Sequence, residues 1–163
     1  MKIIKGIINV ITTLIIIIGG AFLTLYFCGI VPYVVLSGSM EPTIQTGSLC
    51  FVNKKANFNS IKIKDIIAYK MKDGTLVTHR VVSISNKGIQ TKGDRNKGVD
   101  NTLITKNNFV GKDVFWIPKL GYAVVAFQSI KGKIVLITCI IFMLIFAFFF
   151  NENTTIEKTK KEN

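Results

Sequence analysis

The sequence has few of the residues from which metal sites and disulfide frameworks are built. It contains a single histidine, and its three cysteines stand far apart at positions 28, 50 and 139. Structural zinc sites draw on closely spaced cysteine and histidine ligands, and disulfide frameworks need several paired cysteines. We therefore expect neither of these, and no metal or other cofactor.

Acidic residues are also scarce, with nine Asp and Glu against 21 Lys and Arg, which gives a net charge of +12. Yet 49% of the residues are hydrophobic and the mean hydropathy is +0.44. This pairing indicates hydrophobic segments joined to a basic polar part, which is typical of a membrane protein. The basic charge suits anionic lipid headgroups. No nucleic-acid partner is expected, because the basic polar segment between the hydrophobic runs is predicted below to face away from the cytoplasm.

The first hydrophobic run lacks charge from Gly6 to Met40, and its core extends from Ile7 to Val35. It exceeds the roughly 20 residues that cross a bilayer, and it is too long for the apolar part of a cleaved signal sequence, which has about 7 to 15 residues. We expect residues 1–36 to form a short cytoplasmic stub and an uncleaved transmembrane anchor.

A second run, Ile134 to Phe150, has 17 residues, or about 25 Å as a helix. A buried core helix is the alternative, but phenylalanines on every face favour lipid. We expect a second transmembrane helix at 133–151 and a cytoplasmic tail at 152–163. Lysines near both ends then predict a multi-pass protein of the cell membrane, with both termini cytoplasmic and the middle extracytoplasmic.

The middle segment, 37–132, has the patterning of short β-strands. Runs expected as strands are Ser48 to Asn53, Ile66 to Lys70, Leu76 to Val82, Ile89 to Lys92 and Asp113 to Ile117. Asp73-Gly74 lies between two of them, and such a step is a strong hairpin signal. The fold class expected is mostly β, as a small β domain between an N-terminal and a C-terminal transmembrane helix.

Candidate chemistry starts at Ser39, in the S-G-S-M-E-P segment (37 to 42) that follows the anchor. A serine hydroxyl becomes a useful nucleophile only when a base removes its proton. His79 is the one histidine available, although a desolvated lysine such as Lys70 is an alternative base. Asp94 and Asp100 follow in a single loop, and either one is a candidate to orient the imidazole.

Together these segments resemble the type I signal peptidases. The matching stretches are S-G-S-M-E-P (37 to 42), H-R-V (79 to 81) and T-K-G-D-R-N with the aspartate at 100 (91 to 100). Most bacterial members have a lysine as base. With His79 at that position, the chain is similar to the endoplasmic-reticulum type, which also occurs in archaea and some Gram-positive bacteria.

The resemblance implies a serine endopeptidase, signal peptidase I, with Ser39 as nucleophile and His79 as general base. Asp100 is favoured as the triad acid and Asp94 as a supporting partner. Ser37 matches a position that completes the oxyanion hole with the backbone N–H of Ser39. The implied partners are signal-peptide-bearing precursors, cut after a small-x-small site, and the lipid bilayer.

The sequence leaves the client range open, between general secretion and a peptidase dedicated to one or a few fibre or matrix proteins. It also leaves open whether an accessory subunit is needed. A non-catalytic, membrane-tethered β domain that binds a partner is the rival from another class. The joint presence of Ser39, His79 and an acid argues against that rival.

Overall fold

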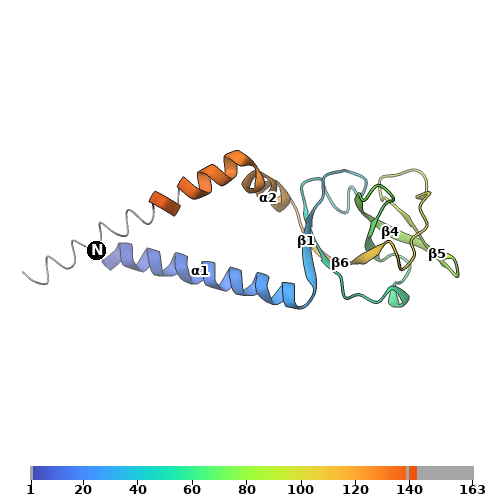
Figure 1. The fold of residues 1–163 in the computed structure, drawn as a ribbon, viewed down its shortest axis with the longest axis horizontal. Helices are drawn as coiled ribbons and strands as arrows, with labels where there is room; N and C mark the ends of the chain where they lie inside the picture. Colours follow the sequence, from blue (N-terminus) through green and yellow to red (C-terminus); the bar gives the residue numbers. More distant parts are fainter. Residues whose placement is uncertain (1, 139, 143–163) are drawn as a thin grey trace, which may run out of the picture. The chain divides into compact units, whose positions relative to one another are not determined.

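A computed structural model describes residues 2–138 and 140–142 of the chain. The predicted fold class is confirmed in its coarser form, because a mostly β domain follows an N-terminal apolar helix (Figure 1). The elements are α1 (Lys2–Phe27), β1 (Ile30–Val34), β2 (Leu49–Asn53), the 3-10 helix η1 (Phe58–Ser60), β3 (Ile66–Lys70), β4 (Leu76–Ser85), β5 (Gly88–Lys92), β6 (Phe109–Ile117) and α2 (Leu120–Gln128).

Helix α1 contains a stretch, Asn9–Phe27, that is long and apolar enough to cross a membrane, and none of it is buried within the protein. The helix ends earlier than the expected anchor, which extended to Val35. Gly29 takes a φ of 80°, which turns the chain out of the helix. The next residues form β1, which pairs with β2 at the edge of the sheet. Composition could not separate this strand from the end of the helix, because both belong to the uncharged, largely apolar run that starts at Gly6.

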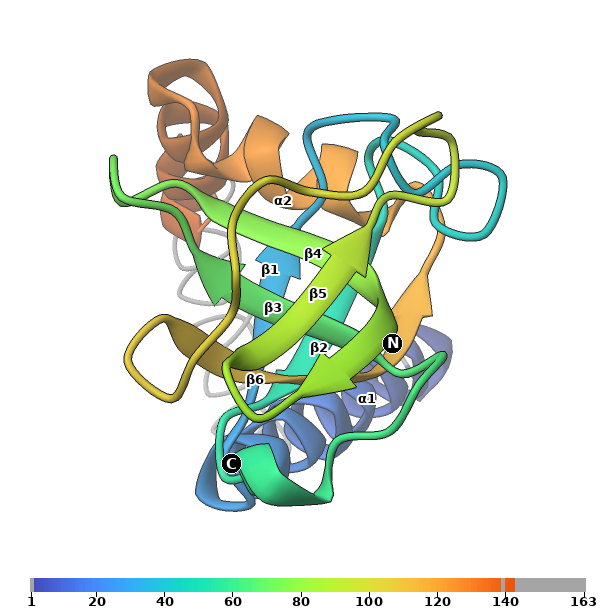
Figure 2. The same ribbon diagram turned by 90° about the vertical axis from the view of Figure 1, so that its right-hand side faces the viewer.

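The six strands form one antiparallel sheet in the order β1-β2-β6-β3-β4-β5. Figure 2 shows the sheet strongly twisted, with β4 and β5 crossing in front of β1 and β2. The Asp73-Gly74 hairpin between β3 and β4 is confirmed, with Gly74 at a φ of 85°. Strand β6 begins at Phe109, before the expected start at Asp113.

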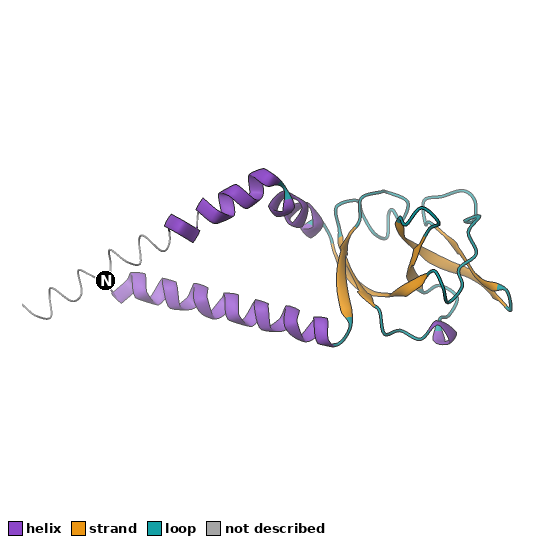
Figure 3. Cartoon of the chain, viewed as in Figure 1, coloured by secondary structure: helices purple, strands orange, loops and turns teal. Residues whose placement is uncertain are grey.

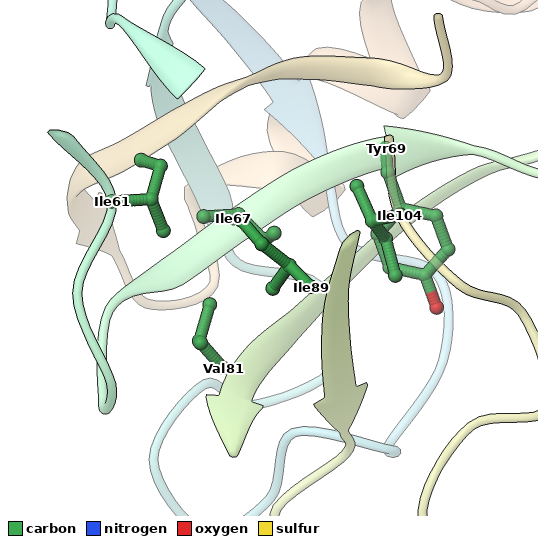
Figure 4. Close-up of a cluster of buried hydrophobic side chains, with 6 residues drawn as sticks. All are labelled: Ile61, Ile67, Tyr69, Val81, Ile89 and Ile104. Atoms are coloured by element: carbon green, nitrogen blue, oxygen red, sulfur yellow. The ribbon is translucent and has the colours of Figure 1, made fainter. Parts of the chain in front are cut away.

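Two clusters of buried side chains support the sheet. The first joins β3, β4 and β5 to the segments that precede and follow them. Its members are Ile61, Ile67, Tyr69, Val81, Ile89 and Ile104 (Figure 4). The second consists of Met40, Ile44, Cys50 and Ile66. Because Met40 and Ile44 follow Ser39 directly in the chain, this second cluster fixes the segment that carries Ser39 onto the sheet.

The C-terminal part, described to residue 142, is helical. Helix α2 is followed by a helix at Ile130–Phe142, and the two are bent by 83°. Figure 3 draws the described helices in purple and the strands in orange. They reach the length and hydropathy of a membrane span only when taken together. The expected second transmembrane helix at 133–151 extends beyond the described residues, as does the tail at 152–163, so both stay predictions.

Asp113 is a buried acid within this sheet. Its side chain is 6% exposed, and neither carboxylate oxygen has a hydrogen-bond partner among the described residues. Burial raises the pKa of Asp113 to about 6, because a low-dielectric interior disfavours the charged form. The folded protein therefore holds a proton here that the unfolded chain releases at lower pH.

We expect Asp113→Asn to remove a pH dependence from the stability. The native state binds the extra proton, so the free energy of unfolding falls as the pH rises from about 4 through 6. Between pH 5 and pH 8, the advantage of Asp113→Asn over the wild type should grow by about 1 kcal/mol. Denaturant unfolding in detergent at both pH values measures this.

Asp73→Asn is the matched control. Asp73 lies in the exposed hairpin, and a hydrogen bond from the Thr75 backbone lowers its pKa. Its contribution is therefore already complete at pH 5 and should not change up to pH 8. Equal pH dependence in the wild type and in Asp113→Asn would show that the carboxyl is charged in the folded state.

Candidate active site

Ser39 lies in the turn between β1 and β2. Met40 and Ile44, which follow it in this turn, are buried and anchor the turn in the core. Glu41 braces the same turn, because its carboxylate accepts a hydrogen bond from the Thr46 hydroxyl at 3.1 Å. The hydrogen bonds from Thr46 lower the pKa of Glu41. The backbone that carries the Ser39 side chain is therefore held in place both by buried apolar side chains and by the hydrogen bond between Thr46 and Glu41.

His79 is placed opposite Ser39 by strand β4. Its side chain is almost fully buried, and its Nε2 atom lies 3.0 Å from Ser39 Oγ. Its Nδ1 atom lies 2.6 Å from Asp100 Oδ2. A carboxylate only accepts hydrogen bonds, so Nδ1 carries the proton and donates it to Asp100, which leaves Nε2 free to accept from the Ser39 hydroxyl.

Asp94 and Asp100 belong to one loop but contact different partners. Asp100 reaches His79, whereas Asp94 forms a two-pronged ion pair with the Arg80 guanidinium, at 2.8 and 2.7 Å. The hydrogen bonds from Arg80 lower the pKa of Asp94. The geometry thus places Asp100, and not Asp94, in hydrogen-bond contact with the imidazole.

The loop that begins at Gly93 also braces the Ser39 turn. The Arg95 backbone N–H donates to the Ser39 carbonyl oxygen at 2.9 Å, and the Arg95 side chain pairs with Glu41 at 2.7 Å. A Cβ atom on Gly93 would lie 2.7 Å from the Ser39 carbonyl oxygen. Only glycine, which has no Cβ atom, permits this close approach between the Gly93 loop and the Ser39 turn.

A groove of about 430 Å³ borders the Ser39 hydroxyl. Its lining is largely apolar and comes from the end of β1, the Ser39 turn and the start of β4, and includes Tyr33, Leu36, Met40, Ile44, Leu76 and Val77. Ser37 also lines it, with its hydroxyl 3.3 Å from Ser39 Oγ. The groove gives an extended chain a path past the hydroxyl.

The arrangement has the parts of nucleophilic acyl transfer. The imidazole can take the Ser39 proton as Oγ attacks a carbonyl carbon, and Asp100 can stabilise the resulting charge. Sequence reasoning had singled out these three residues together with Ser37 and Asp94. It missed Tyr69 and Thr91, whose hydroxyls also contact Asp100. Tyr69 is an ordinary member of a β-prone run, and Thr91 belongs to the T-K-G-D-R-N stretch without any sign of a role of its own.

We expect Gly93→Ala to destabilise the protein by about 1–3 kcal/mol, because the added methyl group overlaps the Ser39 carbonyl and forces the backbone to shift. Gly98→Ala is the control in the same loop, since a Cβ there meets nothing within 4 Å. Thermal unfolding of both variants in detergent measures the difference. Equal midpoints for the two would mean that the loops are not held together as described.

Comparison with known proteins finds a matching family model and several relatives. The model of the family described as signal peptidase, peptidase S26, matches residues 7–112. Signal peptidase I W of Bacillus subtilis is 38% identical over 78 residues, which cover 45% of this chain and 41% of that protein. The signal peptidase complex catalytic subunit SEC11 of Colletotrichum graminicola is 34% identical over 104 residues, which cover 56% of this chain and 60% of that protein.

The SEC11 subunit of Fusarium vanettenii is similar to the same extent, at 33% identity over 104 residues. The chain therefore spans between about two fifths and three fifths of the length of these relatives. The matched segment contains the Ser39 turn, His79 and the loop with Asp94 and Asp100. On the extent of this match, the chain belongs to the signal peptidase family, peptidase S26.

Proposed function

We propose that the chain is a membrane-bound serine endopeptidase, a signal peptidase I, that removes N-terminal signal peptides from exported precursors. The observation that carries this proposal is the continuous hydrogen-bonded series from Ser39 through His79 to Asp100, at 3.0 and 2.6 Å. Membership of the signal peptidase family supports the substrate class.

In this proposal Ser39 is the nucleophile and His79 the general base. As Oγ attacks the scissile carbonyl, Nε2 takes the hydroxyl proton and later passes it to the leaving amine. Asp100 holds the imidazole in the tautomer that presents Nε2, and it stabilises the imidazolium. Asp94 acts indirectly, by holding Arg80 beside His79 in β4.

The oxyanion of the tetrahedral intermediate needs donors of its own. We assign this role to the Ser39 backbone N–H together with the Ser37 hydroxyl, which lies beside Ser39 Oγ. One such donor is typically worth about 2.7 to 4 kcal/mol in the transition state. Since Ser37 and Ser39 stand in the same braced turn, the donors are fixed before the substrate arrives.

The groove beside Ser39 suits an extended precursor segment. Strand β5 pairs with β4 from Arg80 onward, so in the described chain the start of β4, Leu76–Thr78, has a strand neighbour only on the β3 side. A substrate strand can use the open edge for main-chain hydrogen bonds, with pockets that select side chains. The apolar lining of the groove suits small apolar side chains of the substrate.

The membrane places enzyme and substrate together. Helix α1 leads through β1 directly into the Ser39 turn, so a bilayer around α1 keeps the hydroxyl near the surface where a precursor's own hydrophobic helix emerges. We propose a multi-pass chain of the cell membrane, with both termini cytoplasmic and an extracytoplasmic catalytic domain. The run from Ile134 to Phe150 supplies the second span.

Within the same proposal, two points concern which precursors are cut and whether further subunits take part. The relatives include subunits named as part of a signal peptidase complex, which supports testing this chain with and without further membrane proteins. A peptidase dedicated to one or a few fibre or matrix proteins would use the same residues. A non-catalytic binding domain would not need the aligned hydroxyl, imidazole and carboxylate.

The decisive experiment compares the wild type with Ser39→Ala in detergent, using a precursor that carries a signal peptide. We expect the wild type alone to cut, with the new N-terminus following a small-x-small site. Residual cleavage above about a few per cent in Ser39→Ala would remove Ser39 as the nucleophile. Failure of the wild type on a broad set of precursors would favour the non-catalytic reading or a missing subunit.

The two aspartates provide a second test. Asp100→Asn should lower kcat/KM by roughly a hundredfold or more, because the amide no longer holds the reactive tautomer. Asp94→Asn should cost less than about tenfold, since it weakens the Arg80 pair and leaves the His79 contact in place. Initial rates on one precursor measure both, and equal losses would contradict the assignment.

A further inference from the structure

One oxygen of Asp100 receives hydrogen bonds from three side chains, each on a different strand. Oδ2 lies 2.6 Å from His79 Nδ1 on β4, 3.1 Å from the Tyr69 hydroxyl on β3 and 2.6 Å from the Thr91 hydroxyl on β5. Strands β3, β4 and β5 are neighbours in the sheet. The loop carboxylate is therefore held by consecutive strands and not by the imidazole alone.

The two hydroxyl donors are rigidly placed. Tyr69 is 2% exposed and Thr91 is fully buried. The Tyr69 ring packs within the first hydrophobic cluster, and Figure 4 shows it beside Ile104 with its hydroxyl directed away from Ile61 and Ile67. The Asp100 backbone N–H also donates to the Thr91 carbonyl oxygen at 2.8 Å, so Thr91 binds Asp100 through main chain and side chain.

We propose that Tyr69 and Thr91 are positioning residues of the reaction, which orient Asp100 toward His79 and moderate the negative charge that the imidazole meets. This inference rests on the proposed function and extends it to two residues outside the Ser-His-Asp series. Neither residue touches the substrate in this scheme. Thr91 acts through Asp100, and Tyr69 acts chiefly through Asp100, although its hydroxyl also lies 3.5 Å from His79 Nδ1.

Charge decides the direction of the effect. Two hydroxyl donors share the negative charge of Oδ2 and so weaken its pull on the imidazolium proton, because hydrogen bonds to a charged form stabilise that form. Burial raises the pKa of Tyr69 to about 12, so its hydroxyl keeps its proton and donates throughout the working range. The nearby Asp94 is already paired with Arg80 and does not replace either donor.

The main test uses Tyr69→Phe, which removes the hydroxyl and keeps the ring. We expect kcat to fall by about tenfold, with KM within about twofold, since one hydrogen bond to a charged group is lost. The acid limb of the pH–rate profile should move to higher pH, because an unshared carboxylate charge favours the protonated imidazole. Tyr26→Phe is the control, as Tyr26 is exposed on α1 and remote from these contacts.

A direct readout is available because His79 is the single histidine of the chain. NMR titration of its ring protons reports the same change without any substrate. We expect the midpoint to lie at higher pH in Tyr69→Phe than in the wild type or Tyr26→Phe. An unchanged midpoint, or a shift to lower pH, would overturn the proposal.

Thr91 supplies an independent pair of variants. Thr91→Val should reproduce the loss of kcat and the upward shift of the midpoint, whereas Thr91→Ser keeps the hydroxyl and should restore both toward wild-type values. A purely structural role would lower the unfolding temperature without separating the two variants in pH dependence. The titration still applies if the wild type cuts no precursor, so failure of the proposed function and failure of this inference are distinguishable.

Discussion

The hydrogen bond between His79 Nδ1 and the Asp100 carboxylate is the contact on which the rest of the site depends. It determines which nitrogen carries the proton and therefore which nitrogen faces Ser39. In the other tautomer Nε2 would carry the proton and donate it toward the serine hydroxyl, so the imidazole could not take the hydroxyl proton. The short distance and the near-complete burial of the ring hold a single arrangement.

The sheet supports this contact from one side and the loops close it from the other. Strand β4 carries His79, its neighbours β3 and β5 carry Tyr69 and Thr91, and all three strands share one apolar cluster. The loop at Gly93 to Arg95 reaches across to the carbonyl of Ser39. Ser39 and His79 thus belong to separate segments that are joined by short polar contacts, so a small backbone shift in either loop would separate them.

The preference of helix α1 for lipid also determines where the site lies. Helix α1 contains a long apolar stretch, Asn9–Phe27, none of which is buried within the described protein, and lipid is the solvent that suits it. A β domain that begins immediately after such a helix remains near the membrane surface. Under the proposed function, a precursor anchored by its own hydrophobic helix meets the site along the membrane surface, without a search in three dimensions.

Several features were decided by local sequence. The Asp73-Gly74 step between β-prone runs predicted the β3–β4 hairpin, because glycine adopts the positive φ that the turn requires. The length of the uncharged N-terminal run predicted a helix able to span a bilayer. His79 followed from residue type, since it is the single histidine of the chain, whereas Ser39 and the choice of two aspartates followed from the segments that resemble the type I signal peptidases.

Tertiary structure decided the rest. Strand β1 lies inside the apolar run, and its pairing with β2, after the turn at Gly29, separates it from the helix. Asp94 and Asp100 are equivalent as loop residues, and the fold gives one of them to Arg80 and the other to His79. Tyr69 and Thr91 meet at Asp100 because β3 and β5 flank β4. Such contacts join residues far apart in the chain, and their geometry depends on strand order and register, which local patterns do not specify.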